Sequence, residues 1–346
     1  EMSSCDWSSD VCSSDLIWAT RNDSVARMRF VVCGEALIDL IPEVTPPLED
    51  PAFAHLETRW RALSAGGPMN TAIALRRLGE DVQFMGRLGS DGYGEQIGGH
   101  LRGNGVGLDL ARVTSEATSL ALVSLDEHGH ASYTFHFADT ANFSWTREQF
   151  PVLTADDWLH FGSLVTVVDP GASALLGLVR DTEAAVSFDI NVRPTVLTDP
   201  VEYWERVEPF LMAVGRQAGI VKASDEDIAF LVGGLDDPEF DPVAVAAAWT
   251  TAYGLSLFVV TLGAEGVAAV KPDGRVVRFA GYPVEVVDTV GAGDTFMAGF
   301  LSAWVANPAD LEGALQTGAA AAAIVCGRRG ANPPTTAEVE ARIATG

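Results

Sequence analysis

The sequence has few basic residues and no long apolar run. Only 22 of its 346 residues are Lys or Arg, against 47 Asp or Glu, and the formal net charge is −25. Such a surface repels phosphate backbones and anionic lipids, which argues against nucleic acid and membranes as partners. No stretch of about 18 apolar residues occurs, so no transmembrane helix is predicted. An anionic substrate would need a local basic patch against this overall field.

Cysteine is also scarce. The four cysteines, Cys5, Cys12, Cys33 and Cys326, form no CxxC pair and no cluster with the spacing of a zinc site. Cys33 and Cys326 lie in apolar runs and are predicted to be small core residues. A cytoplasmic location, where thiols stay reduced, is the simplest expectation.

The first 28 residues differ from the rest of the chain. Residues 3–16 repeat a Ser-Ser-Asp unit and have neither helical nor strand periodicity. They lack the basic start and apolar stretch of a signal peptide. We therefore expect residues 1–28 to be a non-native leader before a start near Met28. The alternative is a redox or metal-binding tail that uses Cys5 and Cys12.

From Met28 onward, apolar runs alternate with amphipathic ones. This alternation predicts a mostly parallel sheet covered by helices on both faces, with ligands at the carboxyl ends of the strands. The expected strands are 30–34, 82–86, 158–162, 185–189, 219–222 and 257–261, and the expected helices are 68–79, 93–104, 171–182, 202–213, 225–233, 241–254 and 311–326. Thr335 and Glu338 form a capping-box pattern for a last helix.

Two stretches depart from this pattern. Residues 120–125 and 132–137 flank Asp126-Glu127-His128-Gly129, which is a hairpin signal. Tyr133, Phe135 and Phe137 alternate along the second stretch, so one face is aromatic. Together with residues 40–63, they predict a small β lid that could exclude water from a reaction. The alternative is a surface hairpin without a role.

The segment Asp288-Thr289-Val290-Gly291-Ala292-Gly293-Asp294 directly precedes a helical run. Gly291, Ala292 and Gly293 have little side chain to cover their amides, and a helix start favours negative charge, so a phosphate could bind there. A carboxylate would repel that phosphate. Asp294 is instead suited to accept a proton from a hydroxyl that attacks a phosphoryl group. The alternative is a glycine-containing turn capped by Asp294.

A second glycine pair opens the first long helix. Gly66 and Gly67 would let a ligand touch the backbone, and Asn70 offers both a donor and an acceptor. Asp39, after the first strand, could accept hydrogen bonds from two neighbouring hydroxyls. These residues fit an uncharged polyol, unless Asn70 caps the helix and Asp39 makes a turn.

From Met28 to the C-terminus the sequence resembles the ribokinase-like (PfkB) family of sugar kinases. Residues 66–79 and 86–94 are similar to its N-terminal signature, and residues 288–300 to its C-terminal one. The resemblance implies an α/β fold, a three-layer sandwich with a mostly parallel central sheet. The kinase domain would span 29–346, with its lid at about 40–63 and 107–140. It also implies phosphorylation of a small sugar by ATP with Mg²⁺.

The resemblance also implies roles for individual residues. Asp294 would be the base, the amides of Gly291, Ala292 and Gly293 would hold the transferring phosphoryl group, and Asp39, Gly66, Gly67 and Asn70 would bind the sugar. The residues implied for the nucleotide are Lys222, Ser224, Thr261, Gly263, Gly266 and Asn332.

Two metal sites follow from the same resemblance. Mg²⁺ would be held through water near Asp227, where many members have Glu, and Glu226 is the substitute. Some members bind a monovalent cation such as K⁺ beside the anion hole. Asp288 and the carbonyl of Val290 match that site, although Pro334 stands where a hydroxyl often lies.

Within the family, the chain resembles bacterial fructokinases at residues 34–41, 189–194, 221–226 and 330–334. Arg193 would supply the local basic patch, bracing a phosphate or the sugar, and Arg87 is a second candidate for a sugar contact. The alternatives are 2-keto-3-deoxygluconate, ribose or a nucleoside as acceptor, or a sugar-sensing protein without catalysis. The aromatic face of the lid could cover the sugar or join two copies into a homodimer.

Overall fold

The computed structural model describes residues 28–43, 58–125, 131–234 and 239–346. The expected leader up to residue 27, with Cys5 and Cys12, lies outside the described residues. So do residues 44–57 of the expected lid and the turn at Asp126–Gly129.

The central sheet has eight strands in the order β14-β13-β12-β11-β10-β9-β1-β4. Six of them run parallel, and β13 and β14 add an antiparallel edge beside β12. The strands are β1 Arg29–Cys33, β4 Asp81–Met85, β9 Asp157–Gly162, β10 Ala185–Asp189, β11 Ile220–Ser224, β12 Leu257–Thr261, β13 Val267–Val270 and β14 Val276–Phe279. The mostly parallel sheet is confirmed, whereas β13 and β14 were not predicted.

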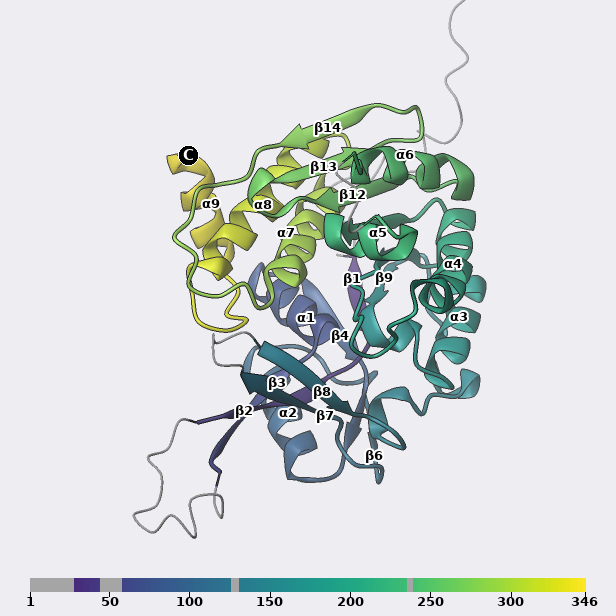
Figure 1. The fold of residues 1–346 in the computed structure, drawn as a ribbon, viewed down its shortest axis with the longest axis vertical. Helices are drawn as coiled ribbons and strands as arrows, with labels where there is room; N and C mark the ends of the chain where they lie inside the picture. Colours follow the sequence, from purple (N-terminus) through teal and green to yellow (C-terminus); the bar gives the residue numbers. More distant parts are fainter. Residues whose placement is uncertain (1–27, 44–57, 126–130, 235–238) are drawn as a thin grey trace, which may run out of the picture.

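Helices cover both faces of this sheet (Figure 1). Along β1, Phe30 and Val32 join one apolar core while Val31 and Cys33 join the other, as period-two alternation requires. The first core packs against α1 Gly67–Arg77, α2 Gly92–Gly103, α7 Ala292–Ala306, α8 Leu311–Cys326 and α9 Thr336–Thr345. The second packs against α3 Gly171–Asp181, α4 Pro200–Arg216, α5 Asp225–Val232 and α6 Pro242–Tyr253. The three-layer sandwich is confirmed.

Shorter features agree in part with the sequence. The capping box of Thr335 and Glu338 starts α9 as predicted. Cys33 is buried as predicted, but Cys326, the last residue of α8, is only half-buried. Short 3-10 helices lie at η2 Ala141–Phe143, η3 Arg147–Gln149, η4 Ser163–Thr166 and η5 Gly263–Glu265. None of the described helices is long and apolar enough to cross a bilayer.

A second, four-stranded sheet stands at the place expected for the lid (Figure 1). Its order is β3-β2-β7-β8, from β3 Trp60–Ala65, β2 Leu37–Pro42, β7 Leu120–Leu125 and β8 Ala131–His136. The predicted hairpin is the antiparallel pair β7–β8. Residues Arg112–Thr114 form β6, which pairs with β5 Arg87–Gly89 in a separate two-stranded sheet. The lid sheet therefore takes only part of the expected range 107–140.

Candidate active site

The N-terminus of α7 carries the glycine-rich segment. Gly291 caps the helix in the left-handed region (φ 77°), and a Cβ added there would lie 2.8 Å from Cβ of Ala331. The N–H of Ala292 donates to the carbonyl of Thr289 at 3.1 Å, so this amide is used within the turn. Among the described residues, nothing accepts a hydrogen bond from the N–H of Gly293, as expected in a first helical turn. An anion could therefore bind at Gly291 and Gly293 more readily than at Ala292.

Asp294 lies in the first turn of α7 and is only 8 % exposed. Its Oδ2 accepts a hydrogen bond from Nδ2 of Asn70 at 2.9 Å. A Cβ added at Gly67 would lie 3.0 Å from its Oδ1, so the starts of α1 and α7 meet at this carboxylate. Burial raises the pKa of Asp294, against Asn70, Arg193 and Lys222, which lower it. A raised pKa makes the carboxylate a better proton acceptor.

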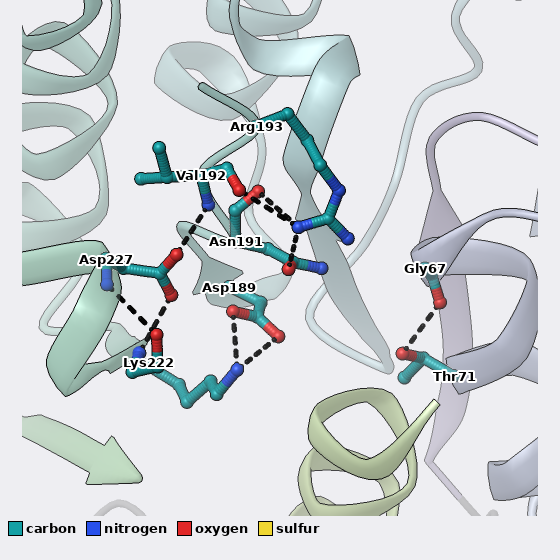
Figure 2. Close-up of polar contacts among 9 residues, drawn as sticks. Gly67, Thr71, Asp189, Asn191, Val192, Arg193, Lys222 and Asp227 are labelled. Atoms are coloured by element: carbon teal, nitrogen blue, oxygen red, sulfur yellow. Dashed lines mark hydrogen bonds and ion pairs between the residues drawn. The ribbon is translucent and has the colours of Figure 1, made fainter. Parts of the chain in front are cut away.

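A buried lysine lies beside the same helix start. Nζ of Lys222 contacts both carboxylate oxygens of Asp189, each at 3.0 Å (Figure 2). The same Nζ would be 3.1 Å from a Cβ added at Gly293. Burial is the largest influence on Lys222 and lowers its pKa, but the negative charges of Asp189, Asp227 and Asp294 and the hydrogen bond to Asp189 together outweigh it. The pKa is raised, so the lysine stays protonated. A positive charge is thereby fixed beside the free amide of Gly293.

Arg193 supplies a second positive charge. Its Nη1 donates to Oδ1 of Asn191 at 2.6 Å and to the carbonyl of Val192 at 3.0 Å (Figure 2). Burial raises the pKa of Asp39 to about 6, and Arg193 opposes this shift as it does at Asp294. Arg193 therefore lies within electrostatic reach of both expected ends of the site, the sugar side and the base.

In the lid sheet, Asp39 belongs to a row of residues that lie directly opposite one another on neighbouring strands. Asp39 pairs with Leu63 on β3 and with Ala121 on β7, and Ala121 pairs with Phe135 on β8. Tyr133 is two residues from Phe135, so it lies on the same face. Burial and the negative charges of Asp39 and Asp288 raise the pKa of Tyr133. The aromatic face therefore continues to the neighbourhood of Asp39.

Ser224, expected near the nucleotide, and Asp227, expected near Mg²⁺, form a hydrogen-bonded cap at the start of α5. Ser224 Oγ accepts from the N–H of Asp227, and Oδ2 of Asp227 accepts from the N–H of Ser224 at 2.8 Å, which is a capping box on α5. Oδ1 of Asp227 accepts from the N–H of Val192, also at 2.8 Å (Figure 2). Each oxygen thus accepts one backbone N–H, while Glu226 is exposed. In the described part of the chain no three acidic, His or Cys residues form a metal site.

Besides Lys222 and Ser224 on β11, the residues expected on the nucleotide side lie in two places. Thr261 ends β12, and Gly263 and Gly266 form the turn into β13, where a Cβ on Gly266 would lie 2.1 Å from the carbonyl of Phe279. Close backbone packing therefore already requires glycine at 266. Asn332 lies next to Ala331, but its Oδ1 accepts from Nη1 of Arg77 at 3.0 Å.

Asp288 connects two loops. Its Oδ1 accepts from the N–H of Val290 at 3.0 Å, and its Oδ2 accepts from the N–H of Gly330 at 2.8 Å. The segment before α7 and the loop at 330–332 are thereby joined next to Gly291.

Arg87 does not join the group around Asp294. It is buried, and its guanidinium donates to the carbonyl of Ala141, to Gln149 and to Glu116, the last at 2.7 Å. Arg87 thus connects the segment before β7 with the segment after β8, and the prediction that it contacts the sugar finds no support.

Three polar residues of this region were not predicted from the sequence to belong to the site. Asp189, the last residue of β10, holds Lys222, and Asn191, two residues later, holds Arg193. Glu35 follows β1, is 2 % exposed, and its Oε2 has no hydrogen-bond partner among the described residues. Their position at the carboxyl ends of parallel strands is the signal that could have identified them.

A comparison with protein families matches residues 28–338 to the pfkB family of carbohydrate kinases. The chain belongs to this family. Among curated proteins it is 36% identical to a fructokinase of Rhizobium leguminosarum bv. trifolii over 78% of each chain. It is 32% identical to one of Klebsiella pneumoniae over 80% of this chain and 84% of that protein. The resemblance on which the residue assignments depend is therefore confirmed.

Solved structures in the pfkB family have the same fold. Fructokinase from Xylella fastidiosa with bound ATP superposes with a TM-score of 0.77 at 26% identity, covering 92% of this chain and 99% of that one. A fructokinase double mutant from Vibrio cholerae, in a form with fructose, ADP and potassium ion bound, gives a TM-score of 0.76 at 27% identity and covers 93% and 100%.

Proposed function

We propose that this carbohydrate kinase is a fructokinase, which transfers the γ-phosphoryl group of ATP to a primary hydroxyl of fructose with Asp294 as the base. The observation that carries the proposal is the buried Asp294 carboxylate at the junction of α1 and α7, bonded to Asn70. The related fructokinases, with ATP in one structure and with fructose and ADP in another, support the choice of substrates.

In the proposed reaction, Asp39, Asn70 and the backbone at Gly66 and Gly67 hold the sugar. Asp294 takes the proton of the hydroxyl, whose oxygen bonds to the γ-phosphorus as the bond from that phosphorus to the bridging oxygen breaks and ADP leaves. Lys222, Arg193 and the amides at the start of α7 stabilise the charge on the transferring group. Thr261, Gly263 and Asn332 would border the nucleotide.

The sequence predicts two metal ions, Mg²⁺ and K⁺, and we assign each to the residues that the structure leaves most suitable for it. Each oxygen of Asp227 already accepts from one backbone N–H group, so we favour the exposed Glu226 as the contact through water. Mg²⁺, when bound with ATP, would neutralise phosphate charge. For K⁺, we propose the neighbourhood of Asp288 and the carbonyl of Val290, on the strength of the potassium ion in the Vibrio cholerae structure.

Two alternative acceptors lose support from the structure. An acidic sugar such as 2-keto-3-deoxygluconate would favour several cations, and Arg87, which the sequence offered beside Arg193, is already paired with Glu116. A nucleoside needs an aromatic sandwich, but Phe143 is buried and Phe137 packs edge-on against it, with ring centroids 5.5 Å apart. Ribose, an uncharged sugar like fructose, remains the second candidate.

Two further proposals concern the setting of the enzyme. The described cysteines, Cys33 and Cys326, are free thiols, which fits a reducing cytoplasm. The exposed apolar side chains of the lid sheet, among them Leu63 and Tyr133, could form the contact between the two copies of a homodimer.

The proposal is tested with Asp294→Asn and a panel of sugars. The amide cannot take the proton, so we expect turnover with fructose to fall by about 10²–10⁴, the contribution of a positioned base, while ATP binding stays near the wild-type value. Asp310→Asn, which changes an acid capping α8, is the matched control and should keep nearly full turnover. If Asp294→Asn stays within about tenfold of wild type, Asp294 is not the base. If fructose gives no phosphate ester, it is not the substrate.

A further inference from the structure

The chain passes between the α/β body and the lid sheet at four places. These are the link from β1 to β2 at 34–36, the link from β3 to α1 at Gly66, the link from β6 to β7 at 115–119, and the link from β8 to η2 at 137–140. Any change in the position of the lid must be absorbed at these four links, which we call the lid root.

Asn142 in η2 lies at the centre of the lid root, with only 1 % of its side chain exposed. Its Oδ1 accepts from the N–H of Ala36 at 3.2 Å, and its Nδ2 donates to the carbonyl of Ala36 at 2.9 Å. The same Nδ2 donates to Oγ of Ser119, also at 2.9 Å. One side chain thus connects the link from β8 with the links into β2 and β7.

Further hydrogen bonds around Ser119 join the same links of the lid root. Oγ of Ser119 is 2.6 Å from Oγ1 of Thr140, and the N–H of Ala141 donates to the carbonyl of Ala117 at 2.9 Å. The carbonyl of Ser119 accepts from the N–H of Ile38 at 3.1 Å. Ser119, Thr140 and Ala141 are buried, so losing one of their partners would leave buried polar atoms unpaired.

The fourth link, at Gly66, contacts the peptide group between Glu35 and Ala36, whose N–H bonds to Asn142. Gly66 has φ 125°, and a Cβ there would be 2.5 Å from the carbonyl oxygen of Glu35 and 3.2 Å from Cα of Ala36. The next residue, Gly67, lies against Asp294, as described above. A continuous path of contacts therefore runs from Asn142 through Ala36, Gly66 and Gly67 to the base, and Ala36 also precedes the strand that carries Asp39.

We propose that Asn142 is a positioning residue, which fixes the lid root so that the sugar-binding side of the lid closes onto Asp294. The inference rests on the proposed kinase function but adds a residue that contacts neither substrate. A hydrogen-bonded amide suits this role because its bonds have fixed directions, so they hold both the N–H and the carbonyl of Ala36 in one orientation. An apolar residue of equal size would fill the space without orienting the two peptide groups on either side of Ala36.

Asn142→Asp tests the inference with almost no change of shape. Its new oxygen faces the carbonyl of Ala36, so the root should loosen. We expect KM for fructose to rise about tenfold or more, the effect of losing a buried hydrogen bond, with ATP affinity unchanged. Water should also reach the γ-phosphorus, giving ADP and inorganic phosphate, so ADP formed per sugar phosphate should exceed the one-to-one ratio of the kinase reaction.

A matched control separates positioning from general stability. Thr250 is also 1 % exposed, and its Oγ1 donates to the carbonyl of Ala246 at 2.7 Å within α6. Thr250→Val should lower the melting temperature but leave KM for fructose and the ADP ratio unchanged. If Asn142→Asp does not fold, Ser119→Ala removes one partner only and should show the same changes in weaker form. A folded Asn142→Asp with wild-type KM and ratio would overturn the inference, as would equal changes in Thr250→Val.

Amide hydrogen exchange gives a readout that needs no turnover. Asn142→Asp should speed exchange in β2 and β7 more than in β10 and β11 of the body. Uniform acceleration would contradict a role at the lid root. A wild-type protein that phosphorylates no sugar would count against the proposed function, and the exchange pattern would still decide the role of Asn142.

Discussion

At single residues, burial sets the acid–base character of the proposed site. Asp294 and Asp39 are both carboxylates whose pKa is raised by burial and lowered by Arg193. The consequences differ. A raised pKa helps Asp294 to accept a proton, whereas Asp39 can accept hydrogen bonds from two hydroxyls of the sugar only while it is ionised.

The pKa of about 6 at Asp39 predicts an acid limb in the pH profile. As the pH falls through 6, Asp39 becomes protonated and loses acceptor capacity, so kcat/KM for fructose should fall toward lower pH with the slope of one proton. The measurement is initial rate at low fructose from pH 5 to 8. Asp39→Asn should have low kcat/KM throughout and lack this limb. If the limb remains near pH 6 in that variant, it belongs to another group.

At the scale of helices and strands, apolar runs predicted the parallel strands because those strands are buried on both faces. The edge strands β13 and β14 escaped prediction because they are only four residues each, and β14 is half exposed. Ser224 and Asp227 show a different limit. The pattern Ser-x-x-Asp fits a helix cap as well as a metal site, and the contact from Val192, more than thirty residues away, could not be predicted from that pattern.

The α5 cap predicts that Asp227 matters for stability more than for Mg²⁺. In Asp227→Asn, one of the two carboxylate oxygens becomes an NH₂ group that faces a backbone N–H. We expect a loss of about 1–2 kcal/mol in the free energy of unfolding, measured by urea denaturation, with the Mg²⁺ dependence of the rate unchanged. Glu226→Gln is the companion variant and should leave stability unchanged. A large rise in the Mg²⁺ requirement of Asp227→Asn at full stability would restore the metal role.

At the scale of the whole molecule, folding brings distant residues together in an acidic protein. Asn70 and Asp294 are 224 residues apart in sequence but share a hydrogen bond. Local patterns identified both helix starts, and the family resemblance implied that they meet. Neither could show that Arg87 would be paired with Glu116, or that Lys222 would be held by Asp189, because these depend on packing between distant segments. The net charge of −25 makes the placement of Lys222 and Arg193 at the site more important for binding ATP.

The lid sheet predicts how two copies would associate. Its outer strands, β3 and β8, have edges that no other described strand covers, and they carry the exposed apolar residues Leu63 and Tyr133. Sheet edges with exposed apolar side chains favour pairing with another chain. We expect the purified protein to be a dimer by light scattering, and Leu63→Asp to shift it toward monomer. The control is Val276→Asp on β14, the edge of the main sheet, where the side chain is similarly exposed. If Val276→Asp dissociates the dimer and Leu63→Asp does not, the contact lies on the main sheet; a monomeric wild-type protein would exclude the lid contact altogether.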